Sequence, residues 1–141
     1  MTSLDSELAD RREAVVRAHM QHENDLDFDA TLATFSHPRY ELIATGEVFD
    51  GADEVMGYYA TSRSAFPDQR NEIRHVHRSD DAVIVEFDLM GTHLGPLRGI
   101  PATGRTFRCP MIAVFVFEGE LIVNERVYFD ASTMLSQLGL A

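Results

Sequence analysis

The chain has 141 residues, close to the commonest size of a single domain, so we expect one domain over residues 1–141 with one hydrophobic core. Its 23 acidic and 12 basic residues give a net charge of −11, which excludes polyanionic partners such as nucleic acid and anionic membrane. The single cysteine, Cys109, excludes an internal disulfide, and no apolar run approaches the roughly 18 residues of a membrane span. The charged, amphipathic N-terminus does not resemble a signal peptide, so a cytoplasmic location is expected.

Helical periodicity dominates the first half of the chain. Apolar residues recur at helical spacing between charges near the N-terminus, with Ser6 as the expected N-cap. Pro38 ends the second helical segment, and Phe66-Pro67 ends the third. The predicted elements are helices over 5–23, 27–35 and 51–65 and a short strand over 40–45.

From residue 70 the hydrophobic period changes from 3.6 to 2, which indicates strands. Two joints, at 79–81 and 118–120, are short enough for hairpins, whereas the segment 95–104 is rich in Gly and Pro and predicts a loop at the rim of a binding site. Helices followed by antiparallel strands indicate the α+β class. The predicted strands are 70–78, 82–93, 105–117 and 120–130, and a short helix over 131–138 closes the chain.

The predicted strand 105–117 is apolar on both faces. Met111 and Phe115 lie on one face, and Ile112 and Val114 lie on the other. Both faces of such a strand are expected to be buried. A chain of this length covers one face itself, so a second copy of the chain is expected to cover the other face. The sequence therefore predicts a homodimer formed through the sheet.

Three stretches of sequence carry a resemblance to a known family. The segment 91–105, GTHLGPLRGIPATGR, and the closing segment 126–130, RVYFD, followed by Gln137-Leu138-Gly139, resemble the SnoaL-like polyketide cyclases. The spacing of Asn24, Asp29, Phe35 and Gly51 is similar to that of ketosteroid isomerase, a more distant relative. The resemblance implies a cone-shaped, nuclear transport factor 2-like fold in which three helices wrap a curved antiparallel sheet around an internal pocket. It also implies a protein that is commonly a dimer and that uses no metal or organic cofactor.

The catalytic residues of these relatives are only partly present. Family cyclases, and limonene epoxide hydrolase on the same scaffold, use an Asp directly before the aromatic residue of the closing segment, where this chain has Val127. A valine cannot exchange a proton, so another group would have to supply that step. At the positions of the phenol and the base of ketosteroid isomerase the chain has His19 and Ile43. The tyrosine that supports the phenol is matched by Tyr59, so a His19–Tyr59 pair is expected at the bottom of the pocket.

Two residues are candidates to replace the missing acid. Glu125 interrupts an apolar row one pleat from Val127, and burial there would raise its pKa toward that of a proton carrier. The alternative is a partly exposed glutamate near the Gly119 turn. His93 ends another apolar row at the mouth of the 95–104 loop, where an imidazole can act as acid or base. The alternative is that His93 only fixes the shape of that loop.

These residues lead to a functional prediction. We expect an enzyme of the cyclase, isomerase or hydrolase type that acts on a small, largely apolar carbonyl or epoxide compound by proton transfer, without a cofactor. His93 and Glu125 would move the proton, and His19 and Tyr59 would hold a polar atom of the ligand. Apolar contact is expected from Phe87, Met111, Phe115 and Val127.

Two other interpretations remain open. The first is a binding protein that kept the pocket and lost the acid at position 127. The second is an interaction protein that uses the sheet face and has no pocket. A metal site at His19 and His22, or at His75 and His77, is not expected, because neither pair is joined by a third ligand motif.

Overall fold

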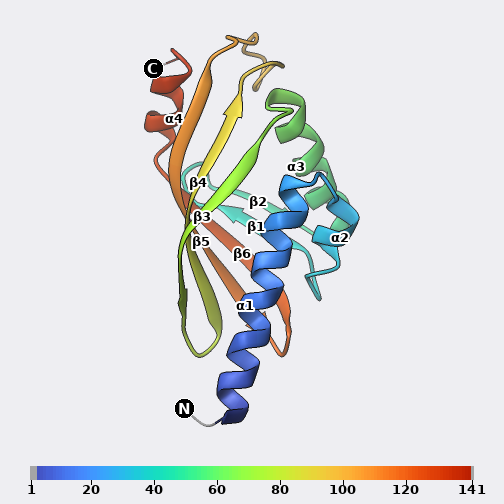
Figure 1. The fold of residues 1–141 in the computed structure, drawn as a ribbon. Helices are drawn as coiled ribbons and strands as arrows, with labels where there is room; N and C mark the ends of the chain where they lie inside the picture. The colour runs from blue at the N-terminus through green and yellow to red at the C-terminus, as the bar shows by residue number, and fades with distance from the viewer. Residues whose placement is uncertain (1–2, 141) are drawn as a thin grey trace.

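The computed structural model describes residues 3–140. Helices α1, α2 and α3 lie on one side of a curved sheet, and α4 lies beside β5, where the Gln137 side chain bonds to the backbone of Arg108 (Figure 1). The predicted α+β class is therefore confirmed. The helices are α1 (Ser3–Asn24), α2 (Phe28–Leu32), α3 (Ala52–Ala65) and α4 (Ala131–Gln137), and the strands are β1 (Arg39–Leu42), β2 (Glu47–Asp50), β3 (Arg70–Arg78), β4 (Ala82–Thr92), β5 (Thr106–Glu118) and β6 (Leu121–Phe129).

The six strands form one sheet in the order β2-β1-β6-β5-β4-β3. Neighbouring strands are antiparallel except for β1 and β6, which run parallel, so the predicted all-antiparallel sheet is corrected at this one pair. The parallel register places Tyr40 beside Glu125 and Leu42 beside Val127. This pairing of distant segments brings the N-terminal half of the chain to the closing strand.

The four long strands lie within one or two residues of their predicted bounds, because alternation of apolar residues identifies them directly. Strand β2 was not predicted, since its four residues alternate only between half-buried and exposed positions. Ser6 is not an N-cap, because α1 already begins at Ser3. Asp27 caps α2 instead, accepting a hydrogen bond from the backbone N–H of Ala30 at 3.1 Å, and this helix ends earlier than expected.

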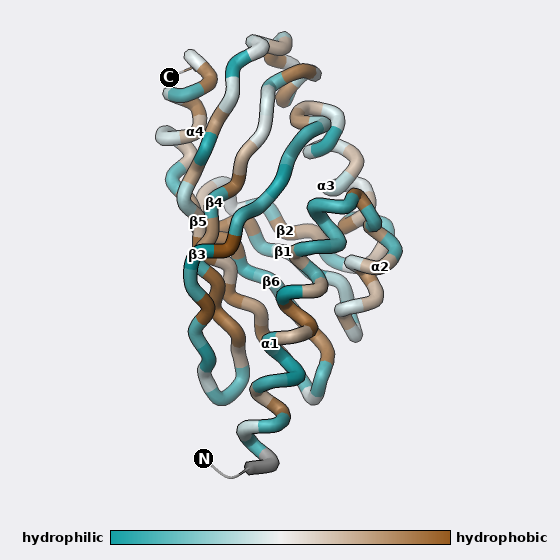
Figure 2. Tube along the Cα trace, in the orientation of Figure 1, coloured by the Kyte–Doolittle hydropathy of each residue, from teal (hydrophilic) through white to brown (hydrophobic). Residues whose placement is uncertain are grey.

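The core lies between the sheet and helices α1 to α3. Alternate residues of β5, from Phe107 to Phe117, are buried and pack against Val16 and Met20 of α1. Hydrophobic residues recur along the strands, whereas much of α1 is hydrophilic (Figure 2). None of the helices built from residues 3–140 combines the length and the apolar character that crossing a membrane requires. The helix face that packs on the sheet also carries polar side chains, His19 and Glu23.

Candidate functional site

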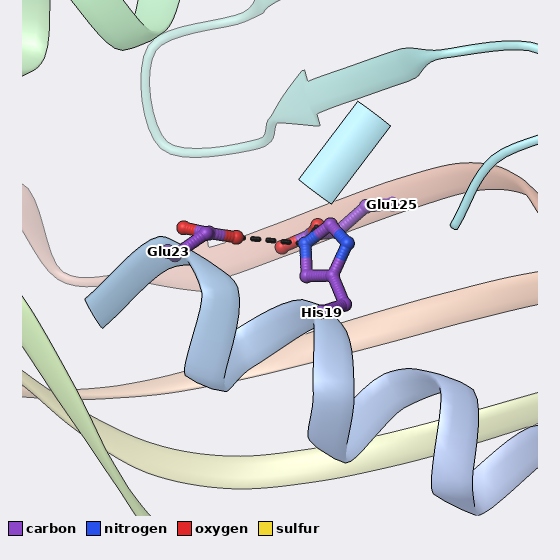
Figure 3. Close-up of side chains that lie close together, drawn as sticks. All are labelled: His19, Glu23 and Glu125. Atoms are coloured by element: carbon purple, nitrogen blue, oxygen red, sulfur yellow. Dashed lines mark ion pairs between the residues drawn. The ribbon is translucent and has the colours of Figure 1, made fainter. Parts of the chain in front are cut away.

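A cluster of polar side chains from α1, β1 and β6 lies inside this core. His19 and Glu23 are four residues apart, so they share one face of α1, and Glu125 reaches them from β6. His19 Nε2 lies 2.7 Å from Glu23 Oε1 and 3.0 Å from Glu125 Oε1 (Figure 3). Tyr40 Oη lies 3.0 Å from the same ring nitrogen, in hydrogen-bond geometry. His19 is fully buried and Glu125 is 5% exposed, so these groups interact without screening by bulk water.

The hydrogen bonds of His19 define its protonation. Thr34 donates its hydroxyl to the carbonyl of Thr31 at 2.6 Å, so its oxygen accepts from His19 Nδ1 at 2.8 Å. In a neutral ring the Nε2 lone pair would then face the carboxylates of Glu23 and Glu125. Burial alone would lower the pKa of His19, but Glu125 and Glu23 outweigh it and raise the pKa to about 9. His19 is therefore an imidazolium near neutral pH.

The two carboxylates differ in their surroundings. Burial alone would raise the pKa of Glu23, but His19 and Arg63 outweigh it, and Arg63 donates to Glu23 Oε2 at 3.3 Å, so this pKa lies below its usual range. Burial raises the pKa of Glu125, and the charge of Glu23 adds to the effect while His19 opposes it. Glu125 Oε1 has no hydrogen-bond partner among residues 3–140. Glu125 Oε1 is thus paired with His19 by charge, at 3.0 Å, and not by an aligned hydrogen bond.

The predicted contact between His19 and Tyr59 is made through an intermediate residue. Tyr40 Oη lies 2.6 Å from Tyr59 Oη and 3.0 Å from His19 Nε2, so Tyr40 links the two. Burial raises the pKa of both tyrosines well above the usual value. Both phenols therefore stay protonated and remain hydrogen-bond donors.

A cavity of about 40 Å³ borders the cluster. Four of the predicted site residues, Glu125, Phe87, Met111 and Val127, lie in its wall, and the usual acid is replaced there by the side chain of Val127. Phe115 is not part of this wall; its ring packs edge-on against His19 with centroids 5.2 Å apart. The remaining wall residues are Met20, Glu23, Tyr40, Tyr58, Gln69, Asn71 and Leu89.

His93 lies apart from the cluster. It is fully buried where β4 enters the loop to β5, and its Nδ1 accepts from the backbone N–H of Thr103 at 3.2 Å. Its ring faces Phe66 with centroids 5.6 Å apart, and its Nε2 has no hydrogen-bond partner within the described chain. These contacts favour the interpretation in which His93 holds the loop in shape.

The possible ligand atoms of the cluster are close enough together to be tested as a metal site. His19 Nε2 and one oxygen each of Glu23 and Glu125 lie within 4.8 Å of one another. Ligand atoms bound about 2.0–2.2 Å from one ion normally stand roughly 3 Å or more apart, whereas His19 Nε2 and Glu23 Oε1 are only 2.7 Å apart. The geometry fits a shared proton better than a shared ion.

A larger hollow of about 780 Å³ lies on the opposite face of the sheet, between β1, β3, β4, β5 and β6. It is open and holds none of the clustered residues, although Phe87 and Met111 border both spaces. Among its polar residues is Asp88, which accepts hydrogen bonds from Arg74 and Arg108 at 2.6 Å each. The smaller cavity is the candidate active site because Glu125 lies in its wall and not in that of the larger hollow.

Sequence reasoning missed several members of the site. Glu23 could have been found, because a carboxylate four residues after a buried histidine lies on the same helix face. Tyr40 carried no such signal, since its place depends on the parallel pairing of β1 with β6. Tyr58 and Gln69 also stand in the cavity wall without a pattern that marks them.

Comparison with known proteins identifies the family. The family model for SnoaL-like polyketide cyclases matches residues 13–138. The chain belongs to the SnoaL-like polyketide cyclase family. This confirms the resemblance seen in the sequence. Among curated proteins, no sequence matches the chain.

Solved structures of low sequence identity share this SnoaL-like fold. A protein of Jannaschia sp. CCS1, assigned as a SnoaL-like polyketide cyclase, has a TM-score of 0.85 and 17% identity, covering 95% of each chain. IdmH of Streptomyces antibioticus, assigned as a polyketide cyclase, has a TM-score of 0.78 and 23% identity over 91% of this chain and 98% of its own. A Catenulispora acidiphila protein of ketosteroid isomerase-like fold, solved with trimethylamine, has a TM-score of 0.77 and 23% identity over 90% of this chain and 93% of its own.

The stability of this SnoaL-like domain is expected to fall as pH rises from about 7 to 10. The raised pKa means that protonated His19 stabilises the folded state. This contribution is complete at pH values below 6.5, the ordinary pKa of histidine, and it is lost as pH rises through about 9. The groups that face His19 are Glu23 of the same helix, Tyr40 of β1 and Glu125 of β6. Urea unfolding at several pH values measures the effect.

The His19→Gln variant is the control for this pH series, because it lacks the titrating ring. Its unfolding free energy should decline less over the same interval than that of the wild type. Parallel curves for the two proteins would show that His19 does not carry a raised pKa.

Proposed function

We propose that this protein catalyses cofactor-free proton transfer on a small carbonyl compound, with Glu125 as the base. One observation supports the proposal above the others: Glu125 is a buried carboxylate in a cavity wall, and His19 contacts its Oε1 as an ion pair at 3.0 Å without an aligned hydrogen bond. Its raised pKa brings it closer to the neutral range in which a general base and acid works best. His93 has no part in this step.

The proposed step begins at the carbon next to the carbonyl. Glu125 takes a proton from this carbon, the C–H bond breaks, and its electron pair moves onto the carbonyl oxygen to form an enolate. The enolate carbon then attacks a second carbonyl of the same molecule, a C–C bond forms, and the new alkoxide takes the proton back from Glu125. The ring closure consumes no other reactant, so the base is regenerated without a cofactor.

His19 has a supporting role in the proposal. As an imidazolium 3.0 Å from Glu125 Oε1, it offsets part of the negative charge that burial disfavours. Tyr40 and Glu23 contact the same ring nitrogen, and Thr34 accepts from Nδ1 on the other side of the ring. This arrangement opposes the effect of burial and favours the ionised form of Glu125, which a base requires.

The cyclase form of the reaction is supported by the family and by the assignment of IdmH as a polyketide cyclase. A binding protein is the second candidate, because Val127 stands where the related cyclases place an acid. Val127→Asp separates the two candidates. An enzyme that relies on Glu125 should gain little from this variant, whereas a binding protein would gain turnover that the wild type lacks.

The test uses 2,5-hexanedione, a neutral diketone that can exchange its α-hydrogens and close to a five-membered ring. In D2O, ¹H NMR follows loss of the α-hydrogen signals and appearance of the cyclic hydroxyketone. We expect the wild type to accelerate exchange over buffer. Exchange no faster with the wild type than with Glu125→Gln would contradict the proposal.

We also propose a homodimer formed through the outer face of the sheet. Ile43, Ile112 and Tyr128 are exposed around the larger hollow, an apolar group that a partner would cover. Arg74 and Asp88 place a positive and a negative charge in the same area. In a dimer with a two-fold axis, Arg74 of one copy can therefore face Asp88 of the other.

Ile112→Asp is expected to convert this dimer to a monomer, because a carboxylate at the centre of the patch would be buried without a partner. Light scattering coupled to size-exclusion chromatography measures the mass. Leu121→Asp is the matched control, since Leu121 is equally exposed but lies outside the hollow. Equal masses for the wild type and Ile112→Asp would rule out this interface.

A further inference from the structure

Most polar groups in the wall of the small cavity already have partners in the protein. Tyr40 bonds to Tyr59 and to His19, and Glu23 is held by His19 and Arg63. Asn71 donates its side-chain amide to the carbonyl of Met20 at 3.0 Å, and its backbone N–H bonds to the Asn24 side chain at 2.8 Å. A ligand therefore finds few polar groups free to bind it.

Two hydrogen-bond donors in the wall stand without a partner in the described chain. Gln69 is 6% exposed, and its backbone N–H donates to Phe66 at 3.0 Å, but its side-chain amide makes no hydrogen bond. The ring of Tyr58 stacks on Phe49 with centroids 4.8 Å apart, which fixes its direction, and its hydroxyl is likewise unpaired. Neither group is fully enclosed by protein, so water or a ligand in the cavity can supply its partner.

We propose that Gln69 and Tyr58 bind the carbonyl oxygen of the ligand while Glu125 faces the neighbouring carbon. This rests on the proposed function, and it adds the groups that recognise the substrate and stabilise the enolate. An amide N–H and a phenol O–H donate to an oxygen, and both interactions strengthen as negative charge develops on it. Glu125 supplies a buried carboxylate in the same wall.

The size and charge of the cavity limit the ligand further. A cavity of about 40 Å³ holds about three water-sized probes, since one needs roughly 10–15 Å³. A carbonyl group with its flanking carbons fits this space, so the ligand enters by its carbonyl end and the rest of it stays outside. The carboxylates of Glu23 and Glu125 stand in the wall and would repel an anion. The site is thus specific for a neutral carbonyl head group and selects against carboxylates.

The proposal is tested by binding, which needs no turnover. With 2-butanone as the neutral probe and propionate as its anionic counterpart, ¹H–¹⁵N NMR titration follows the side-chain amide of Gln69 and gives Kd. We expect 2-butanone to shift that signal and propionate to leave it unchanged. Replacing both donors, Gln69→Leu with Tyr58→Phe, should raise Kd about tenfold or more, as the loss of two neutral hydrogen bonds predicts.

Gln21→Leu, on the exposed surface of α1, is the matched control, and its Kd should equal that of the wild type. Tyr58→Phe alone keeps the ring stack, so it reports the hydroxyl even if the double variant folds poorly. A Kd within about twofold of the wild type in Tyr58→Phe and Gln69→Leu, or equally tight binding of propionate, would overturn the proposal.

The two proposals can fail separately. If 2-butanone binds through Gln69 and Tyr58 but 2,5-hexanedione exchanges no hydrogens, the recognition groups stand and Glu125 is not the base. If exchange depends on Glu125 while the donor variants leave KM and kcat unchanged, the base stands and these recognition groups are wrong.

Discussion

Replacing Glu125 by glutamine is expected to slow hydrogen exchange from 2,5-hexanedione by about 10²–10⁴-fold, the usual contribution of a general base. Glutamine keeps the size and the hydrogen-bonding oxygen of the side chain but cannot take a proton from carbon. The substitution also removes one of two buried negative charges beside His19, so the fold should be retained. Exchange rates from ¹H NMR, compared at equal concentrations of folded protein, measure the effect.

Glu118→Gln is the matched control, because it makes the same chemical change at an exposed position at the end of β5. Its exchange rate should equal that of the wild type. A Glu125→Gln variant that stays folded and retains the wild-type rate would remove Glu125 from the mechanism.

Replacing His19 by glutamine is expected to destabilise the protein by about 3–5 kcal/mol, the cost of removing one partner of a buried ion pair. Without the imidazolium, Glu23 and Glu125 stand in the core with Arg63 as the cation in contact, and Arg63 reaches only Glu23. Urea denaturation followed by circular dichroism measures the loss. The cost arises because the buried charge of Glu125 loses its partner. Adding Glu125→Gln removes that charge, so it should restore part of the stability.

His22→Gln is the control for this variant, since His22 lies three residues further along α1 and is not part of the cluster. A loss for His19→Gln no larger than that for His22→Gln would contradict the ion-pair account. Additive losses in the His19→Gln, Glu125→Gln double variant would show that these two residues do not interact energetically.

The elements of this fold were predictable where the hydrophobic pattern is strong. Strand β5 buries every second residue over its whole length, and hydrophobic residues run through β4 and β6 between short polar turns, so their bounds follow from the sequence. Strand β2 has four residues and no buried face, which leaves no periodic signal. The parallel contact of β1 with β6 joins segments about 85 residues apart and depends on how the sheet closes.

The candidate site was predictable in part for the same reason. Glu125 was identifiable because a carboxylate interrupts an apolar row, and the structure shows that it is buried. His19 emerged only through the resemblance to ketosteroid isomerase, and its link to Tyr59 runs through Tyr40. His93 shows the limit of pattern alone: an imidazole at the end of an apolar row can face a ligand or a loop, and only the contact with Thr103 distinguishes them.

A ¹³C NMR titration of the Glu125 side-chain carboxyl, assigned by its absence in Glu125→Gln, tests the central claim most directly. A buried acceptor without a hydrogen-bond partner should titrate above the ordinary glutamate value of 4.5, and 2-butanone should perturb its signal. A carboxyl that titrates at or below 4.5, and whose signal the ketone leaves unchanged, would contradict the assignment of Glu125 as the proton carrier.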